Sequence, residues 1–158
     1  MATEQEQLKE VLEEFFSHLP FSPTFEVNKK EKEDGVLFHC KIYVQDGSKI
    51  LIGHNGLNLY ALEHMVRLLV GRKLGREYRI VLDVNDYLHQ KNRKIALQAQ
   101  QAAQDVARQR RPIILPPMNG RERRIVHLIL ADDDRIETES IGTGEDRKVV
   151  IKPKNDLS

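Results

Sequence analysis

Two short motifs in this chain combine residue types and spacings that suit contact with phosphate. Gly53-His54-Asn55-Gly56 places two glycines where a tight backbone can approach a sugar-phosphate chain closely. The helix expected after it would aim free N–H groups at phosphate oxygens. Arg123 and His127 are spaced so that one helix face offers a forked guanidinium and a ring able to hydrogen-bond or stack on a base. Each spacing arises about 0.5 times by chance at this composition, so neither motif is diagnostic without its surroundings.

The first motif lies within a helix–strand–strand–helix–helix–strand (αββααβ) order, which the apolar periodicity predicts. We expect a helix at 4–18, a hairpin with strands around 25–27 and 36–44, a helical turn at 49–52, an apolar helix over 57–70 that ends near Gly71, and a strand at 79–84. An ordinary helix–helix turn would place the same two glycines between 49–52 and 57–70, so this alternative stays open.

The second motif lies in a helix that follows a long connecting helix over 86–111, which Pro112 ends. Asn119 with Glu122 three residues later predicts a capping box, and the helix runs to about Ala131. Two strands, about 135–141 and 147–152, complete this half. Helical projection places one broad apolar arc opposite the basic residues. The arc consists of Ile125, Val126, Leu128, Ile129 and Leu130, and the opposite side carries Arg123, Arg124 and His127, with Arg121 at its margin.

The net charge of +1 hides an uneven distribution along the chain. Residues 1–34 have a net charge of −5, residues 35–66 of 0, residues 67–124 of +9 and residues 125–158 of −3. A basic middle is what phosphate binding needs. Basic side chains that only solvate helix faces would give the same pattern.

Several functional classes lack support in the sequence. There is no G-x-S-x-G and no G-x-x-x-x-G-K motif, so we expect no enzymatic activity. Asp132–Asp134 suits a hard cation and leaves a metal-dependent nuclease as a minor option, but a solvated turn explains it more simply. The lone Cys40 falls on the apolar side of its strand and reads as a small core residue. No segment reads as membrane-spanning, and we expect a cytoplasmic protein.

The stretch 112–152 resembles a single-stranded nucleic-acid-binding domain, the R-3-H domain, named for its Arg-x3-His motif. The resemblance rests on Pro116-Pro117-Met118-Asn119, Arg123-Arg124-Ile125-Val126-His127, Thr138-Glu139-Ser140-Ile141-Gly142 and Arg147-Lys148-Val149-Val150-Ile151. The first half resembles a type II KH domain, whose G-x-x-G loop usually carries Lys or Arg where this chain has His54 and Asn55. The pair of domains in this order resembles the bacterial Jag/KhpB family, also called SpoIIIJ-associated proteins.

The resemblance implies an α+β fold with a KH-like domain at 1–85 and an R-3-H domain with a short sheet at 86–158, the latter including the connecting helix. Many family members carry an additional N-terminal Jag domain, and we expect this chain to lack it. The implied function is binding of single-stranded RNA, with single-stranded DNA as an alternative ligand, as an RNA chaperone or post-transcriptional regulator without cofactor or metal. The implied contacts are Gly53, His54, Asn55, Gly56, Arg121, Arg123, Arg124, His127, Arg147 and Lys148.

Two points stay open. Arg147 and Lys148 also fit a solvated strand end. The second function class is a protein-interaction scaffold, in which the KH-like half pairs with itself or with a KH-domain protein such as KhpA, a partner associated with this family. A pull-down after nuclease treatment separates the two functions, because partners bridged by RNA are lost.

Overall fold

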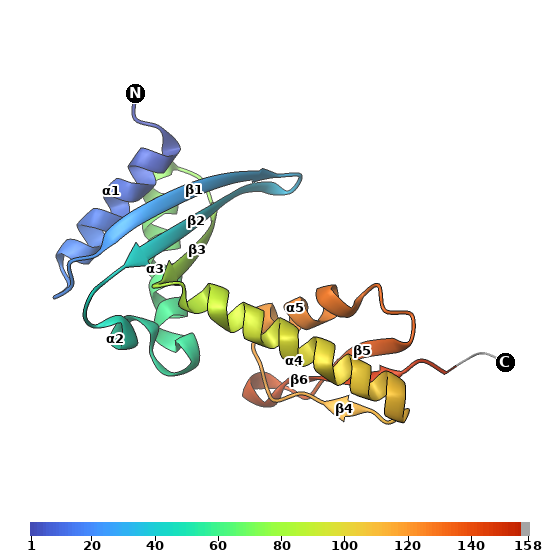
Figure 1. Cartoon of the computed structure of the whole chain (residues 1–158). Helices are drawn as coiled ribbons and strands as arrows, with labels where there is room; N and C mark the ends of the chain where they lie inside the picture. Colours follow the sequence, from blue (N-terminus) through green and yellow to red (C-terminus); the bar gives the residue numbers. More distant parts are fainter. Residues whose placement is uncertain (156–158) are drawn as a thin grey trace. The chain divides into compact units, whose positions relative to one another are not determined.

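The chain forms a mixed α+β structure that divides into two compact units, Met1–His89 and Gln90–Ser158. The computed structural model describes residues 1–155 (Figure 1). Each unit contains one three-stranded sheet with helices packed on it, which confirms the predicted α+β class. The domain boundary expected after residue 85 stays a prediction, and the last three residues of the expected second domain lie outside the described range.

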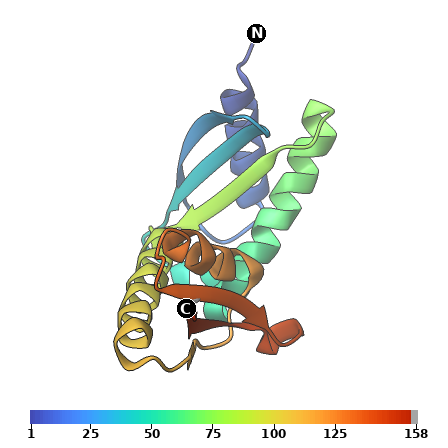
Figure 2. The ribbon, with the colours of Figure 1, turned by 90° about the vertical axis from the view of Figure 1, so that its right-hand side faces the viewer.

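The first unit has the predicted αββααβ order. Its elements are α1 (Glu4–Ser17), β1 (Thr24–Lys32), β2 (Gly35–Tyr43), α2 (Ser48–Ile52), α3 (Leu57–Leu74) and β3 (Arg79–Val84), with a 3-10 turn at His54–Gly56. β1 and β2 form an antiparallel hairpin, and β3 pairs parallel with β2 because the chain crosses over through α2 and α3. Helices α1 and α3 lie on the same face of this sheet (Figures 1 and 2).

The core of the first unit lies between that sheet face and the two helices. Alternation along β2 turns Phe38, Cys40 and Ile42 toward the helices, where all three are fully buried. Cys40 is therefore the core residue that the sequence predicts. Burial raises the pKa of its thiol to about 12, so the thiol stays protonated and is a poor nucleophile.

Helix α3 does not end near Gly71 as the sequence predicts. It continues to Leu74, and Gly75 ends it in the left-handed conformation at φ 74°. A glycine inside a helix costs only about 1 kcal/mol, and the packing of Leu74, beyond Gly71, against the core of the first unit offsets this cost. Within residues 1–155, neither α3 nor any other helix combines the length and apolar character needed to cross a bilayer.

The second unit joins two helices to a small antiparallel sheet. Its elements are α4 (Tyr87–Gln109, which begins in the first unit), β4 (Ile113–Ile114), α5 (Gly120–Leu130), β5 (Ile136–Ile141) and β6 (Lys148–Pro153), with a 3-10 turn at Gly144–Asp146. The strand order is β4-β6-β5. The predicted apolar stripe of α4 is confirmed, since Ile95, Ala99, Ala102 and Val106 are buried in the core with α5 and β6.

The start of α5 is fixed by the predicted capping box. Asn119 Oδ1 accepts a hydrogen bond from the Glu122 N–H (3.0 Å), and Glu122 Oε2 accepts one from the Asn119 N–H (2.9 Å). The other carboxylate oxygen, Oε1, lies 2.6 Å from Nζ of Lys91 on α4. Glu122 thus caps α5 and also ties it to α4.

Removing the cap should destabilise the second unit. Asn119→Ala deletes the acceptor for the Glu122 N–H, and we expect a loss of about 1 kcal/mol in the free energy of unfolding, measured by urea denaturation. Asn119→Ser keeps a capping oxygen and should stay near wild type, as should Gln98→Ala on the exposed side of α4. A serine variant as unstable as the alanine variant would rule out the capping interaction as the cause.

Candidate nucleic-acid interface

Helix α5 packs on the second unit's core through a different side from the one the helical projection predicts. Val126 and Leu130 are buried as expected, but Leu128 and Ile129 are 64% and 40% exposed. The prediction of one broad apolar arc is therefore wrong for these two residues. The physical reason is a polar contact: His127 is held against β5, so the helix is rolled toward its His127 side and turns Leu128 and Ile129 outward.

Both ring nitrogens of His127 have partners on β5. Nδ1 lies 2.7 Å from Thr138 Oγ1, and Nε2 lies 2.8 Å from Ser140 Oγ. Thr138 and Ser140 are two residues apart on the strand, so their side chains share one face. Burial, and to a smaller extent the nearby Arg123 charge, lowers the pKa of His127 below its ordinary value. The neutral ring donates through one nitrogen and accepts through the other, and either hydroxyl can complement it.

Arg123, the other member of the Arg-x3-His motif, is half-buried beside His127. Its Nε is buried and has no hydrogen-bond partner among the described residues. A guanidinium whose stem is packed loses less side-chain entropy when it binds an anion. The structure thus holds the Arg123 charge near the start of α5, close to Gly120.

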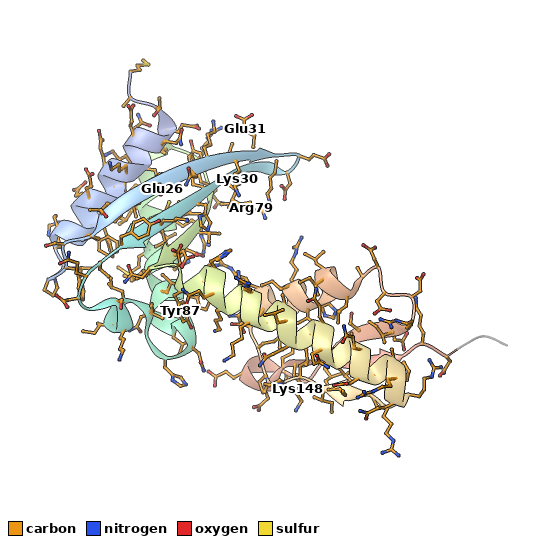
Figure 3. The ribbon with its side chains drawn as sticks, in the orientation of Figure 1. Glu26, Lys30, Glu31, Arg79, Tyr87 and Lys148 are labelled. Carbon is orange, nitrogen blue, oxygen red and sulfur yellow. The ribbon has the colours of Figure 1, made fainter. Side chains whose placement is uncertain are left out.

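The remaining basic residues of the predicted site differ in exposure. Arg121 and Arg124 are exposed on the outward side of α5. Arg147 is exposed just before β6, and Lys148 is the half-buried first residue of β6, paired with Ile141 (Figure 3). Three arginines thus lie on α5, whose one acidic residue is buried and paired with Lys91.

The Gly53–Gly56 loop is a tight turn between α2 and α3 in the first unit. Gly53, Asn55 and Gly56 all have positive φ, at 70°, 51° and 84°. His54 and Asn55 form the exposed tip, where Asn55 Nδ2 lies 3.2 Å from His54 Nε2. The loop therefore presents a polar, uncharged amide and an imidazole to solvent.

The two glycines of this loop are required by contacts within the chain itself. A Cβ at Gly53 would lie 2.6 Å from the side chain of Asn58, and one at Gly56 would lie 3.3 Å from Tyr87 and 3.4 Å from Tyr60 (Tyr87 is labelled in Figure 3). The close approach that the sequence predicts for a ligand is thus made here by side chains of α3 and α4.

The acidic turn after α5 has a structural partner. Asp133 accepts hydrogen bonds from the Arg135 side chain at 2.9 and 2.8 Å, and these bonds lower the pKa of its carboxyl group. Across residues 1–155, no three His, Cys, Asp or Glu side chains are grouped so that they could hold a metal ion.

Sequence reasoning missed three residues that position this site, namely Thr138, Ser140 and Lys91. Thr138 and Ser140 alternate with exposed Glu137 and Glu139, so hydroxyl groups occupy the inward face of a strand. Polar residues on an inward face signal a polar partner, but the sequence does not identify His127 as that partner. Nothing in the sequence pairs Lys91 with Glu122, because the two residues belong to different helices.

Comparison with known proteins matches the second half of the chain to the R-3-H domain, over residues 93–153. The RNA-binding protein KhpB of Clostridium symbiosum is 31% identical over 154 residues, which cover 98% of this chain and 68% of that protein. The RNA-binding protein KhpB of Bacillus subtilis strain 168 is 30% identical over 131 residues, which cover 82% of this chain and 62% of that protein.

Among solved structures, Aquifex aeolicus Era bound to GDP.AlF4- aligns with 51% of this chain and 29% of its own at a TM-score of 0.41 and 20% identity, a similarity too low to support an argument. The KhpB relatives and the R-3-H match together confirm the resemblance predicted from the sequence. The chain belongs to the KhpB family.

Proposed function

We propose that this chain binds single-stranded RNA and acts as an RNA chaperone or post-transcriptional regulator in the bacterial cytoplasm. The observation that carries the proposal is the arrangement of α5, which holds Arg121, Arg123 and Arg124 while its one acid, Glu122, is buried and paired with Lys91. The second unit as a whole has 14 basic and 10 acidic residues, against 11 and 14 in the first. Its relatives are named as RNA-binding proteins, and it matches the R-3-H domain.

The proposed contacts are to the sugar-phosphate backbone. Arginine binds phosphate oxygens in a forked geometry, and such contacts carry no sequence information. Arg147 and Lys148 extend the basic surface on the proposed path of the strand, and single-stranded DNA should bind as well, because its phosphates are the same. The His54-Asn55 tip of the first unit's turn is the proposed second contact, made through hydrogen bonds of the Asn55 amide and the His54 ring.

In this proposal the main role of His127 is to position α5 against β5. With both nitrogens held by Thr138 and Ser140, only its ring face is left for a base. We also infer binding without catalysis, since Asp133 in the acidic turn after α5 is engaged by Arg135 and the relatives are named as RNA-binding proteins.

A specific observation favours pairing through the first unit as a second role. Along the outward side of α3 run Leu57, Met65, Leu68 and Leu69, all at least 40% exposed. They form a stripe on an 18-residue helix whose one acidic residue, Glu63, is buried. We propose that a second copy of this chain covers the stripe, because two such helices packed antiparallel about a two-fold axis bury the same residues and keep their basic ends apart. A KH-domain partner would be the alternative occupant.

The salt dependence of RNA binding tests the primary role. Arg123→Gln/Arg124→Gln removes two charges from α5, and the slope of log K against log salt for a short single-stranded RNA should fall by about 1.4 in magnitude. Fluorescence anisotropy at several salt concentrations measures it. Lys9→Gln/Lys32→Gln removes two exposed charges from the first unit and should leave the slope unchanged. Binding by wild type that does not depend on salt would contradict the proposal.

The pH dependence of stability tests the environment of His127. Its folded-state pKa is lowered from 6.5, so below pH 6.5 the unfolded chain takes up a proton that the folded chain does not. Stability should therefore fall as the pH decreases from 6.5 through the folded-state pKa. Urea unfolding at pH 7.5 and pH 5 should show a smaller loss in His127→Gln than in wild type. Equal losses in the two proteins would contradict a neutral, half-buried His127.

The oligomeric state tests the second role. Leu68→Glu places a charge in the middle of the α3 stripe, at a side chain that is 60% exposed, so it should not unfold the monomer. We expect wild type to sediment as a dimer and Leu68→Glu as a monomer. Leu97→Glu, at a leucine 58% exposed on α4, is the matched control and should remain dimeric. A monomeric wild type would exclude self-pairing.

A further inference from the structure

The outward side of α5 combines exposed arginines with exposed apolar side chains. Arg121, Arg124 and Leu128 are spaced i, i+3 and i+7, so they line one ridge of the helix, with Ile129 beside it. Leu128 is 64% exposed, although the second unit buries its other apolar residues on α5 to a greater extent. The exposure follows from the contacts of His127 with β5, which turn this ridge away from the core.

The charges along this ridge are graded from one end to the other. Arg121 and Arg124 occupy its first two turns, and the helix's one acid, Glu122, is on the inward side at 6% exposure. Leu128 occupies the third turn, and exposed Asp132 follows just beyond the helix. A phosphate is therefore attracted to the N-terminal part of the ridge and repelled at its C-terminal end. The C-terminal part of the ridge itself exposes the uncharged, apolar side chains of Leu128 and Ile129.

Such a ridge matches a single strand of nucleic acid, which carries a phosphate and an unpaired apolar base face at each step. We infer that this ridge is a nucleotide subsite, in which Arg121 and Arg124 hold the backbone phosphate and Leu128, with Ile129, contacts the adjoining base. The inference rests on the proposed RNA binding and specifies which side chains contact bases. It assigns base contact to Leu128, outside the Arg-x3-His motif. Because an aliphatic side chain makes no directional hydrogen bond, this contact should accept any base.

The test compares two oligomers that share a backbone. One is a short single-stranded RNA, and the other is its abasic counterpart, with ribose and phosphate but no bases. Affinities for the full chain are measured by fluorescence anisotropy at two salt concentrations. Leu128→Ala should weaken binding of the RNA by about fivefold, with an unchanged salt slope, and should not affect the abasic oligomer. Arg124→Ala should weaken both oligomers and lower the slope by about 0.7.

Two further variants sharpen the comparison. Leu128→Trp enlarges the surface available for stacking and should tighten RNA binding while leaving the abasic oligomer unchanged. Leu97→Ala truncates a leucine of similar exposure on α4 and should change neither affinity. Both positions are exposed, so the fold should tolerate the changes, and circular dichroism of each variant is the check.

The outcomes separate the subsite from the proposed function. If wild type binds RNA and Leu128→Ala leaves the affinity for both oligomers unchanged, the subsite is overturned and RNA binding stands. The same conclusion follows if Leu128→Ala lowers both affinities by the same factor. If Leu128→Ala changes the sedimentation of the protein and not its RNA affinity, the ridge is a protein interface and the subsite is again overturned. If wild type binds neither oligomer, the proposed function itself fails, and the subsite fails with it.

Discussion

The carboxylate of Glu122 is the group on which the arrangement of the second unit depends. One oxygen accepts the N–H of Asn119 and closes the capping box, and the other lies 2.6 Å from Lys91 Nζ. A buried carboxylate needs such partners, because removing one member of a buried pair costs several kcal/mol. The same contacts withdraw the only negative charge of α5 from its surface. A helix with three arginines is therefore left with no exposed acid within its own length.

The two members of the Arg-x3-His motif have different surroundings, and this difference determines what α5 exposes. His127 is bound through both nitrogens to β5, so it fixes the rotation of the helix about its axis. Arg123 lies beside it with a packed stem, and Arg124 and Leu128 lie on the outward side. In the proposed mechanism the histidine sets the orientation, the arginines bind phosphate and the apolar ridge receives a base. The spacing of the motif therefore serves the packing of α5 on β5, through His127, as well as contact with a ligand.

Features that depend on neighbouring residues could be predicted from the sequence, and features that depend on distant ones could not. Asn119 and Glu122 form their capping box within one helical turn, so the pattern alone predicts it. The sequence predicts the end of α3 near Gly71, but the tertiary packing of Leu74 extends the helix to that residue, and Gly75 ends it. The exposure of Leu128 is not predicted for the same kind of reason. Periodicity depends only on the spacing of apolar residues, and it does not include the hydrogen bonds of His127 to Thr138 and Ser140.

The most direct test of the central claim, that α5 receives the nucleic acid, is a titration of the isotope-labelled full chain with a short single-stranded RNA, followed by backbone-amide NMR. We predict that the largest shift changes fall on Arg121–Leu128, with a second, smaller set at His54–Gly56, while α1, whose first turn is acidic, changes little. Shift changes concentrated on α1 and β1, with α5 unaffected, would contradict the account.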